Sequence, residues 1–152
     1  MLREELTEAM KTAMRAKDDK ALGTIRMVLA KLKDLDIAAR PSGNTTGITD
    51  DQILSMMQGM IKQRRESITL YQKGGRQDLV DQESAEITVI EKFLPQQMDE
   101  AATKDAVAKA IAAVGATSIK DMGKVMGELK KTYTGQMDFA AAGVVVKGLL
   151  GG

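Results

Sequence analysis

The sequence predicts an all-α protein, with an N-terminal four-helix region followed by a small three-helix C-terminal domain. Apolar residues recur at helical spacings along the chain, and no segment shows the sustained two-residue alternation of a β-strand. Both prolines, Pro41 and Pro95, fall between the periodic segments. A hydrophobic fraction of 43% with 28% charged residues is typical of a globular protein, so a chain of 152 residues can form a core.

The first two predicted helices each carry one apolar face. The apolar positions are Leu2, Leu6, Met10 and Met14 in the first helix, and Leu22, Ile25, Leu29 and Leu32 in the second. The second helix follows Asp18 and Asp19 and stops before PSGNTTG, residues 41–47. This segment is expected to be a loop, because glycine, proline, serine and asparagine favour turns.

The third and fourth helices are expected to form a hairpin. Thr49, with Gln52 three residues later, is a capping-box signal for the start of the third helix. KGGR, residues 73–76, then turns the chain. The fourth helix is expected over residues 78–93.

A proline marks the expected boundary between two domains. Pro95 ends the fourth helix within LPQQMD, so the domains are predicted as residues 1–94 and 95–152. The three helices of the second domain are expected at residues 99–114, 119–132 and 138–150. Ser118, with Asp121 three residues later, is expected to cap the middle one.

An arginine and two glutamates fall within the apolar faces of the predicted hairpin. In a projection at 100° per residue, Arg64 lies among apolar residues of the third helix, and Glu83 and Glu86 lie among those of the fourth. If residues 73–76 close an antiparallel turn, Arg64 meets these glutamates. We favour a buried structural ion pair that sets the register of the two helices. A carboxylate pair with the arginine as an anion clamp, or an exposed incidental arrangement, are the alternatives.

The segment SIKDMGKVMGELKKTY, residues 118–133, contains two glycines although its pattern is helical. The expected core side holds Met122, Val125, Met126 and Leu129. The opposite side holds Lys120, Lys124, Gly127 and Lys131, with Gly123 at its border. Glycine costs roughly 1 kcal/mol in a helix interior relative to alanine. One interpretation is close approach of an anionic nucleic-acid backbone between the lysines. The other is a solvated charged face, with the glycines tolerated or packed against another helix.

The same motif carries a resemblance to a known family. KDMGKVMGELKK, preceded by IEKFLPQQM and by IKQRRESITLYQKGGRQDL, resembles the YqeY family, also called GatB/YqeY domain proteins, over essentially the whole chain. The resemblance implies four N-terminal and three C-terminal helices. It also implies that the C-terminal part is similar to the tail domain of the tRNA-dependent amidotransferase B subunit, which contacts tRNA while the amide chemistry happens elsewhere. Family members are often labelled carbon–nitrogen ligases with glutamine as amido-N-donor.

One position departs from the pattern of the family. The resemblance leads us to expect Gly-Arg-x-Asp and then glycine after the lysine-bearing helix. This chain has Gly135, Gln136, Met137, Asp138 and Phe139 there. A cation expected near the RNA surface is therefore replaced by Gln136.

Composition argues against catalysis by the isolated chain. The sequence has no cysteine and no histidine, which removes disulfides, the usual zinc ligands and the commonest nucleophile–base pairs. Neither a phosphate-binding glycine loop nor a serine–lysine amidase pattern is present. We therefore expect no catalytic residues, no metal and no cofactor, and we interpret the ligase label as a sign of ancestry.

The expected partner is tRNA or another structured RNA, bound through the lysine and glycine face of the C-terminal domain. With 22 basic and 21 acidic residues, any such surface must be local, and no DNA binding is expected. Only four aromatic residues are present, so recognition of phosphates and RNA shape fits better than stacking on single strands. A protein of the aminoacyl-tRNA or amidotransferase system is a further candidate partner. The alternative function is a helical protein–protein interaction module without RNA binding, since 11 methionines supply adaptable apolar surface.

Neither a secretory signal peptide nor a membrane-spanning segment is expected from the sequence. The first residues, MLREELTEAM, are charged from the third position and do not form a signal peptide. The longest apolar run, Phe139 to Val146, is too short to cross a bilayer. We therefore expect a cytoplasmic protein with no membrane partner.

Overall fold

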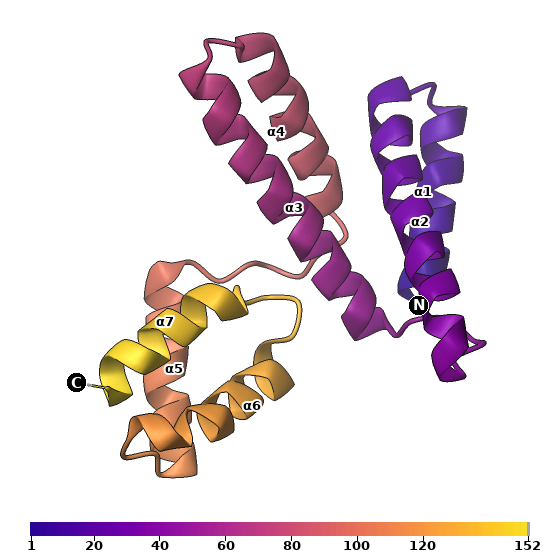
Figure 1. The fold of residues 1–152 in the computed structure, drawn as a ribbon. Coiled ribbons are helices and arrows are strands. Elements are labelled where there is room, and N and C mark those ends of the chain that lie inside the picture. Colours follow the sequence, from indigo (N-terminus) through magenta and orange to yellow (C-terminus); the bar gives the residue numbers. More distant parts are fainter. Residues whose placement is uncertain (152) are drawn as a thin grey trace. The chain divides into compact units, whose positions relative to one another are not determined.

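The computed structural model describes residues 1–151 and confirms the all-α prediction. These residues form seven α-helices and two short 3-10 helices, and none of them lies in a strand (Figure 1). The chain divides into two compact units, one of residues 1–94 and one that begins at Pro95.

The N-terminal unit consists of two helical hairpins (Figure 1). Its helices are α1 (Leu2–Arg15), α2 (Asp19–Ala39), α3 (Asp50–Lys73) and α4 (Gln77–Glu91), with a 3-10 turn at Arg40–Ser42. α1 packs against α2, α3 packs against α4, and α2 also contacts α4. Asp18 caps α2, because its Oδ1 accepts the Ala21 N–H at 3.1 Å. The predicted capping box is present on α3: Gln52 N–H donates to Thr49 Oγ1 at 3.2 Å, and Thr49 N–H donates to Gln52 Oε1 at 2.8 Å.

The core of the N-terminal unit is aliphatic and methionine-rich. Its fully buried side chains come from all four helices and are Leu6, Val28, Ile53, Met57 and Ile90. Burying each such side chain contributes about 1.5–3 kcal/mol to folding. This core holds the two hairpins together at the end where the chain passes from α2 to α3.

A partly buried ion pair that we did not predict joins α1, α2 and the segment before α3. The guanidinium of Arg3 donates two hydrogen bonds to the carboxylate of Asp36, at 2.6 and 2.7 Å, and a third to the carbonyl of Ile48 at 2.8 Å. Asp36 in turn accepts the Ile48 N–H at 2.8 Å. Gly47, at φ 101°, leaves room for this arrangement, since a Cβ there would collide with the Arg3 guanidinium. The hydrogen bond from Arg3 lowers the pKa of Asp36.

The C-terminal unit is a three-helix bundle. Its helices are α5 (Glu100–Val114), α6 (Met122–Tyr133) and α7 (Phe139–Leu150), with a 3-10 turn at Ile119–Asp121 before α6. Each α-helix packs against the other two. The fully buried side chains of the core include Val107, Val125, Leu129, Met137 and Val146. Asp99 and Asp138 cap α5 and α7 by accepting backbone N–H groups of the first turn.

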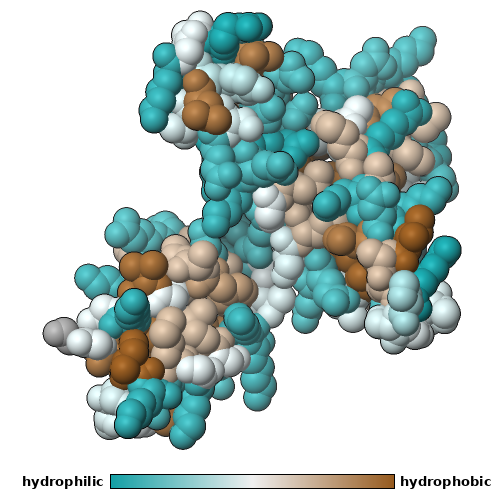
Figure 2. Space-filling view, in the orientation of Figure 1, coloured by the Kyte–Doolittle hydropathy of each residue, from teal (hydrophilic) through white to brown (hydrophobic). Residues whose placement is uncertain are grey.

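The surface of the C-terminal unit has hydrophobic side chains over α7 (Figure 2). Val144 is 72% exposed and Leu149 is 49% exposed. Within the described chain, no helix has both the length and the apolar character needed to span a bilayer.

Candidate nucleic-acid interface

The lysine-bearing segment differs from the single helix that we predicted. Residues 119–121 form a 3-10 turn, and the α-helix begins only at Met122. Asp121 explains this break, because its carboxylate accepts the N–H groups of Thr117, at 3.0 Å, and Ser118, at 3.4 Å. These backbone hydrogen bonds, that of Thr117 first, lower the pKa of Asp121. The predicted capping box of Ser118 and Asp121 is therefore present, but it caps the 3-10 turn.

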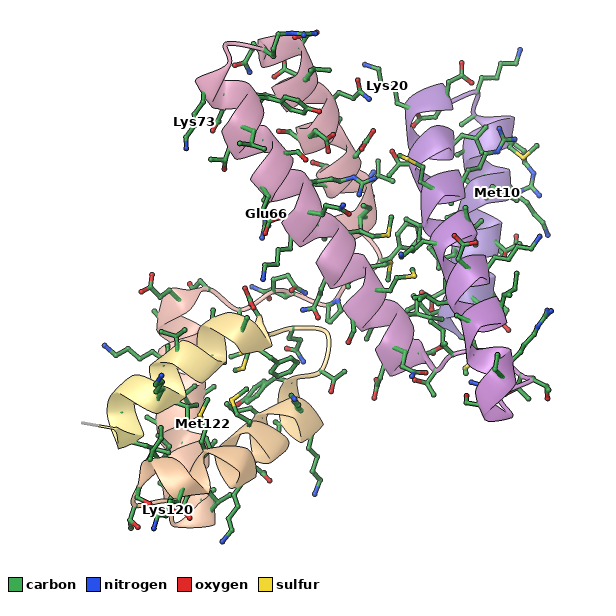
Figure 3. All side chains as sticks on the ribbon, in the orientation of Figure 1. Met10, Lys20, Glu66, Lys73, Lys120 and Met122 are labelled. Carbon is green, nitrogen blue, oxygen red and sulfur yellow. The ribbon has the colours of Figure 1, made fainter. Side chains whose placement is uncertain are left out.

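The 3-10 turn changes how the lysines are placed. A 3-10 helix has three residues per turn, so the 100° projection does not apply to Lys120. Lys124, Gly127 and Lys131 do share one face of α6, since they lie within α6 at spacings of three, four and seven residues. Figure 3 labels Lys120 on the 3-10 turn and shows Met122 turned toward the other helices of this unit. The Met122 methyl group lies 3.6 Å from the place where a Cβ on Gly143 of α7 would be.

The lysine face, defined here as Lys120, Gly123, Lys124, Gly127 and Lys131, is exposed at every position. The opposite side of α6 is buried through Val125 and Leu129. A Cβ built on Gly123 or Gly127 would meet no atom within 4 Å. Neither glycine therefore packs against a neighbouring helix within this unit, which removes the small-residue packing interpretation there.

Open space alone does not distinguish these two glycines. Gly23 in α2 and Gly59 in α3 also have no atom within 4 Å of a built Cβ. What separates α6 is the combination of two such glycines with exposed lysines one turn away on the same face. A backbone without side chains between two cations allows an extended anion to approach closely.

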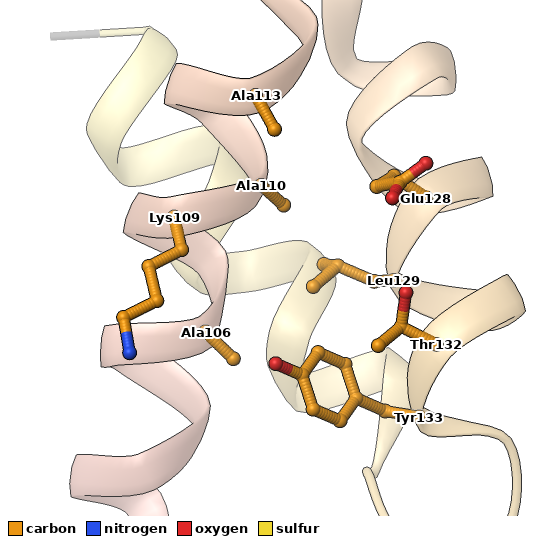
Figure 4. Close-up of a pocket in the computed structure, with 8 residues that line it drawn as sticks. All are labelled: Ala106, Lys109, Ala110, Ala113, Glu128, Leu129, Thr132 and Tyr133. Atoms are coloured by element: carbon orange, nitrogen blue, oxygen red, sulfur yellow. The ribbon is translucent and has the colours of Figure 1, made fainter.

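A hollow lies between α5 and α6 (Figure 4). It has a volume of about 160 Å³ and is lined by Ala106, Lys109, Ala110, Ala113, Glu128, Leu129, Thr132 and Tyr133. In Figure 4 the three alanines of α5 point toward α6, and Leu129 lies between the two helices. Helix periodicity gives no sign of this hollow, because it depends on which faces of α5 and α6 meet.

Of the two charged side chains that line the hollow, only Lys109 makes an ion pair with another described residue. Lys109 Nζ lies 3.1 Å from the Asp105 carboxylate in the next turn of α5. Glu128 makes no ion pair with any described residue, although Lys124 and Lys131 lie one turn away on either side. An exposed i,i+4 pair contributes little to stability, so Lys109 remains available to a ligand.

Gln136, at the position where the resemblance led us to expect arginine, lies in the loop between α6 and α7. Its carbonyl accepts the Met98 N–H at 2.9 Å. The side-chain amide of Gln97 donates to the Gly135 carbonyl at 2.6 Å. Gly135 adopts φ 81°, a left-handed conformation that favours glycine. The Gln136 side chain makes no hydrogen bond to the described residues. Its hydrogen bonds are made by its backbone.

The arginine and the two glutamates of the N-terminal unit come together. Arg64 Nε lies 2.9 Å from Glu86 Oε2 and 3.9 Å from Glu83 Oε2. The Arg64 side chain is only 13% exposed, and its Nη1 also donates to the Met60 carbonyl at 3.3 Å. Burial raises the pKa of Glu83, and the charge of Glu86 raises it further, while Arg64 opposes the shift. This geometry fits a structural ion pair, since one arginine engages both carboxylates.

The described residues contain no cluster of metal-binding side chains. Among them, no group of three or more acidic residues is arranged to hold a metal ion. The features that remain are the lysine face, the hollow between α5 and α6 and the Arg64 ion pair.

The protein is therefore a small all-α protein, with an N-terminal unit of two helical hairpins and a C-terminal three-helix bundle. The chain belongs to the YqeY family: the family model described as "Yqey-like protein" matches residues 3–150. The resemblance in KDMGKVMGELKK and the two preceding motifs is thus confirmed.

Several curated relatives share the name "Altered inheritance of mitochondria protein 41, mitochondrial". The protein of Vanderwaltozyma polyspora is 33% identical over 101 residues, which cover 62% of this chain and 52% of that protein. Those of Eremothecium gossypii and Saccharomyces cerevisiae are 35% and 33% identical over 89 residues, covering 59% and 57% of this chain and 46% and 45% of theirs. The chain spans about half the length of the curated relatives it matches.

These names contradict the cytoplasmic location that we predicted. The similar proteins are named mitochondrial. The prediction failed because it rested on the lack of a secretory signal peptide and of a membrane-spanning run, which does not distinguish a mitochondrial protein from a cytoplasmic one.

Proposed function

We propose that this protein is an accessory protein related to the tRNA-dependent amidotransferases, and that its C-terminal unit binds tRNA or another structured RNA. The observation that carries the proposal is the lysine face: three exposed lysines beside two exposed glycines with open space around them. Lysines neutralise phosphates and release counterions, which supplies most of the sequence-independent affinity for RNA. Membership of the YqeY family supports the proposal, because the motif resemblance implies a C-terminal part similar to the tRNA-contacting tail domain of the amidotransferase B subunit.

A protein partner is the second candidate. Val144 of α7 is 72% exposed, and Leu149 is 49% exposed. A protein of the aminoacyl-tRNA or amidotransferase system could cover this apolar surface while the lysine face contacts RNA.

Gly127→Leu tests the lysine face directly. We expect RNA affinity to fall several-fold, because the new side chain occupies the space between Lys124 and Lys131. The bundle should remain folded and become more stable by up to about 1 kcal/mol, since leucine is the better helix former and its Cβ meets nothing within 4 Å. Fluorescence anisotropy with labelled tRNA, together with thermal unfolding, measures both effects.

Gly59→Leu in α3 is the matched control. Its glycine is also exposed and also has open space around a built Cβ, but it lies in the N-terminal unit. RNA affinity should be unchanged in this variant. Equal losses in both variants would mean that the α6 glycines have no part in binding.

The isolated protein should show no glutaminase or amidotransferase turnover. The chain contains no cysteine or histidine, which removes the commonest nucleophile–base pairs. Ammonia release from glutamine, with and without ATP and mischarged tRNA, is the measurement. Release above background that a point substitution in this chain abolishes would contradict this expectation.

A further inference from the structure

We propose that the hollow between α5 and α6 accepts one unpaired nucleobase of the bound RNA. This inference rests on the proposed function, because it assigns a base-binding role to a second surface of α6, the helix that also carries Lys124 and Lys131. The hollow has a volume of about 160 Å³, which is below the roughly 300–1,000 Å³ of pockets for drug-sized ligands. A single planar group therefore fits it better than a whole metabolite.

The walls of the hollow suit a flat aromatic ring. Ala106, Ala110 and Ala113 line one side, where their small side chains leave the surface of α5 open (Figure 4). Leu129 is fully buried beneath them, and the ring of Tyr133 lies at the end of the hollow. Stacking of a base on one aromatic ring gives substantial affinity with little dependence on sequence. One tyrosine cannot support a row of stacked bases, but it is enough for one.

Apart from Lys109, which pairs with Asp105, the polar side chains that line the hollow have no hydrogen-bond partner within the described chain. The Glu128 carboxylate and the hydroxyls of Thr132 and Tyr133 make no hydrogen bond to any described residue. Pockets for small ligands combine an apolar lining with a few such polar groups. Carboxylates accept hydrogen bonds from base amino groups. The hollow should therefore prefer a base that carries an amino group, such as cytosine, to uracil.

The charge pattern favours a nucleotide over a peptide. Lys124 and Lys131 flank Glu128 along α6, at spacings of four and three residues. Lys124 and Lys131, which do not line the hollow, match the phosphates of a nucleotide. The Glu128 carboxylate, which does line it, matches the amino group of the base. An acidic peptide would meet the Glu128 charge in the hollow, whereas a basic one would meet the lysines around it.

Two RNA hairpins and two alanine variants test this assignment. The hairpins differ only by one bulged cytosine, and affinities are measured by anisotropy at equal salt. Ala113→Leu fills the hollow from an exposed position of α5, whereas Ala112→Leu adds the same side chain to the adjacent exposed position outside it. The parent and Ala112→Leu should bind the bulged hairpin about tenfold more tightly, as stacking of one base allows. Ala113→Leu should lose this preference and still bind the unbulged hairpin like the parent.

The outcomes separate this inference from the proposed function. Equal binding of both hairpins by the parent, or a preference that survives in Ala113→Leu, overturns the base site and leaves the lysine face standing. Failure of the parent to bind either hairpin or tRNA overturns the proposed function as well. Exchanging the bulged cytosine for uracil should weaken parent binding, and Glu128→Gln should remove that difference. Discrimination that is unchanged in Glu128→Gln contradicts the role of the carboxylate.

Discussion

Arg64→Glu should lower the free energy of unfolding of the N-terminal unit by about 3–5 kcal/mol, the usual cost of breaking a buried ion pair. The side chain is 13% exposed, and it lies 2.9 Å from Glu86 and 3.9 Å from Glu83. Reversing its charge would bring three carboxylates together between α3 and α4. Urea unfolding followed by circular dichroism measures the loss.

Arg65→Glu is the matched control for this variant. Arg65 is the next residue of α3, and its side chain is 65% exposed while it pairs with Glu91 at 3.2 Å. Because exposed pairs contribute about 0–1 kcal/mol, this control should unfold close to the parent. Similar losses in the two variants would mean that burial of Arg64 contributes nothing.

The pH dependence of Arg64→Glu provides a second readout. Burial and the Glu86 charge already raise the pKa of Glu83. The folded state therefore binds this proton more tightly than the unfolded state does. This contribution to stability is full below the unfolded pKa and is lost as the pH rises through the folded pKa. Removing the arginine should enlarge the effect, so the variant should regain stability as the pH falls from 7 toward 5.

Replacing Lys120, Lys124 and Lys131 together by glutamine should flatten the salt dependence of RNA binding. If each lysine neutralises one phosphate, the slope of log affinity against log salt concentration should fall by about two to three units. Anisotropy titrations with tRNA over a range of salt concentrations measure this slope. A loss of affinity without a change in slope would mean that these lysines do not contact phosphates.

The control changes the same number of charges elsewhere. Lys20, Lys31 and Lys33 are exposed on α2, and replacing them by glutamine should leave the slope nearly unchanged. Gln136→Arg should steepen the salt dependence instead, because it adds a cation to the loop between α6 and α7. Its side chain makes no hydrogen bond that an arginine would disrupt.

Helix positions and most caps are local properties, which is why the sequence alone determined them. The box of Thr49 and Gln52 needs only residues three apart. The approach of Arg64 to Glu86 follows from helix periodicity and a four-residue turn, since both residues belong to one hairpin. The exposure of Lys124, Gly127 and Lys131 likewise follows from the apolar residues on the other side of α6.

The path of the chain into α6 was not predicted correctly. The signal of Ser118 and Asp121 was read as the start of an α-helix, but the Asp121 carboxylate accepts two backbone N–H groups and holds a 3-10 turn. Both kinds of helix can begin with the same cap. Whether an α-helix or a 3-10 turn forms depends on how the segment packs. Here the side chain of Ile119 packs near the end of α7, where its Cδ1 lies 3.9 Å from a Cβ built on Gly151.

Only the tertiary structure decided the contacts between distant segments. Arg3 and Asp36 are 33 residues apart, and no local pattern pairs one arginine with that carboxylate among the 21 acidic residues of the chain. The hollow between α5 and α6 depends on which faces meet, because Ala113 and Tyr133 belong to different helices. Local sequence determined the helices and their polar faces through short-range hydrogen bonds and periodicity. Packing of those faces decided which polar groups were neutralised and which were left open to a ligand.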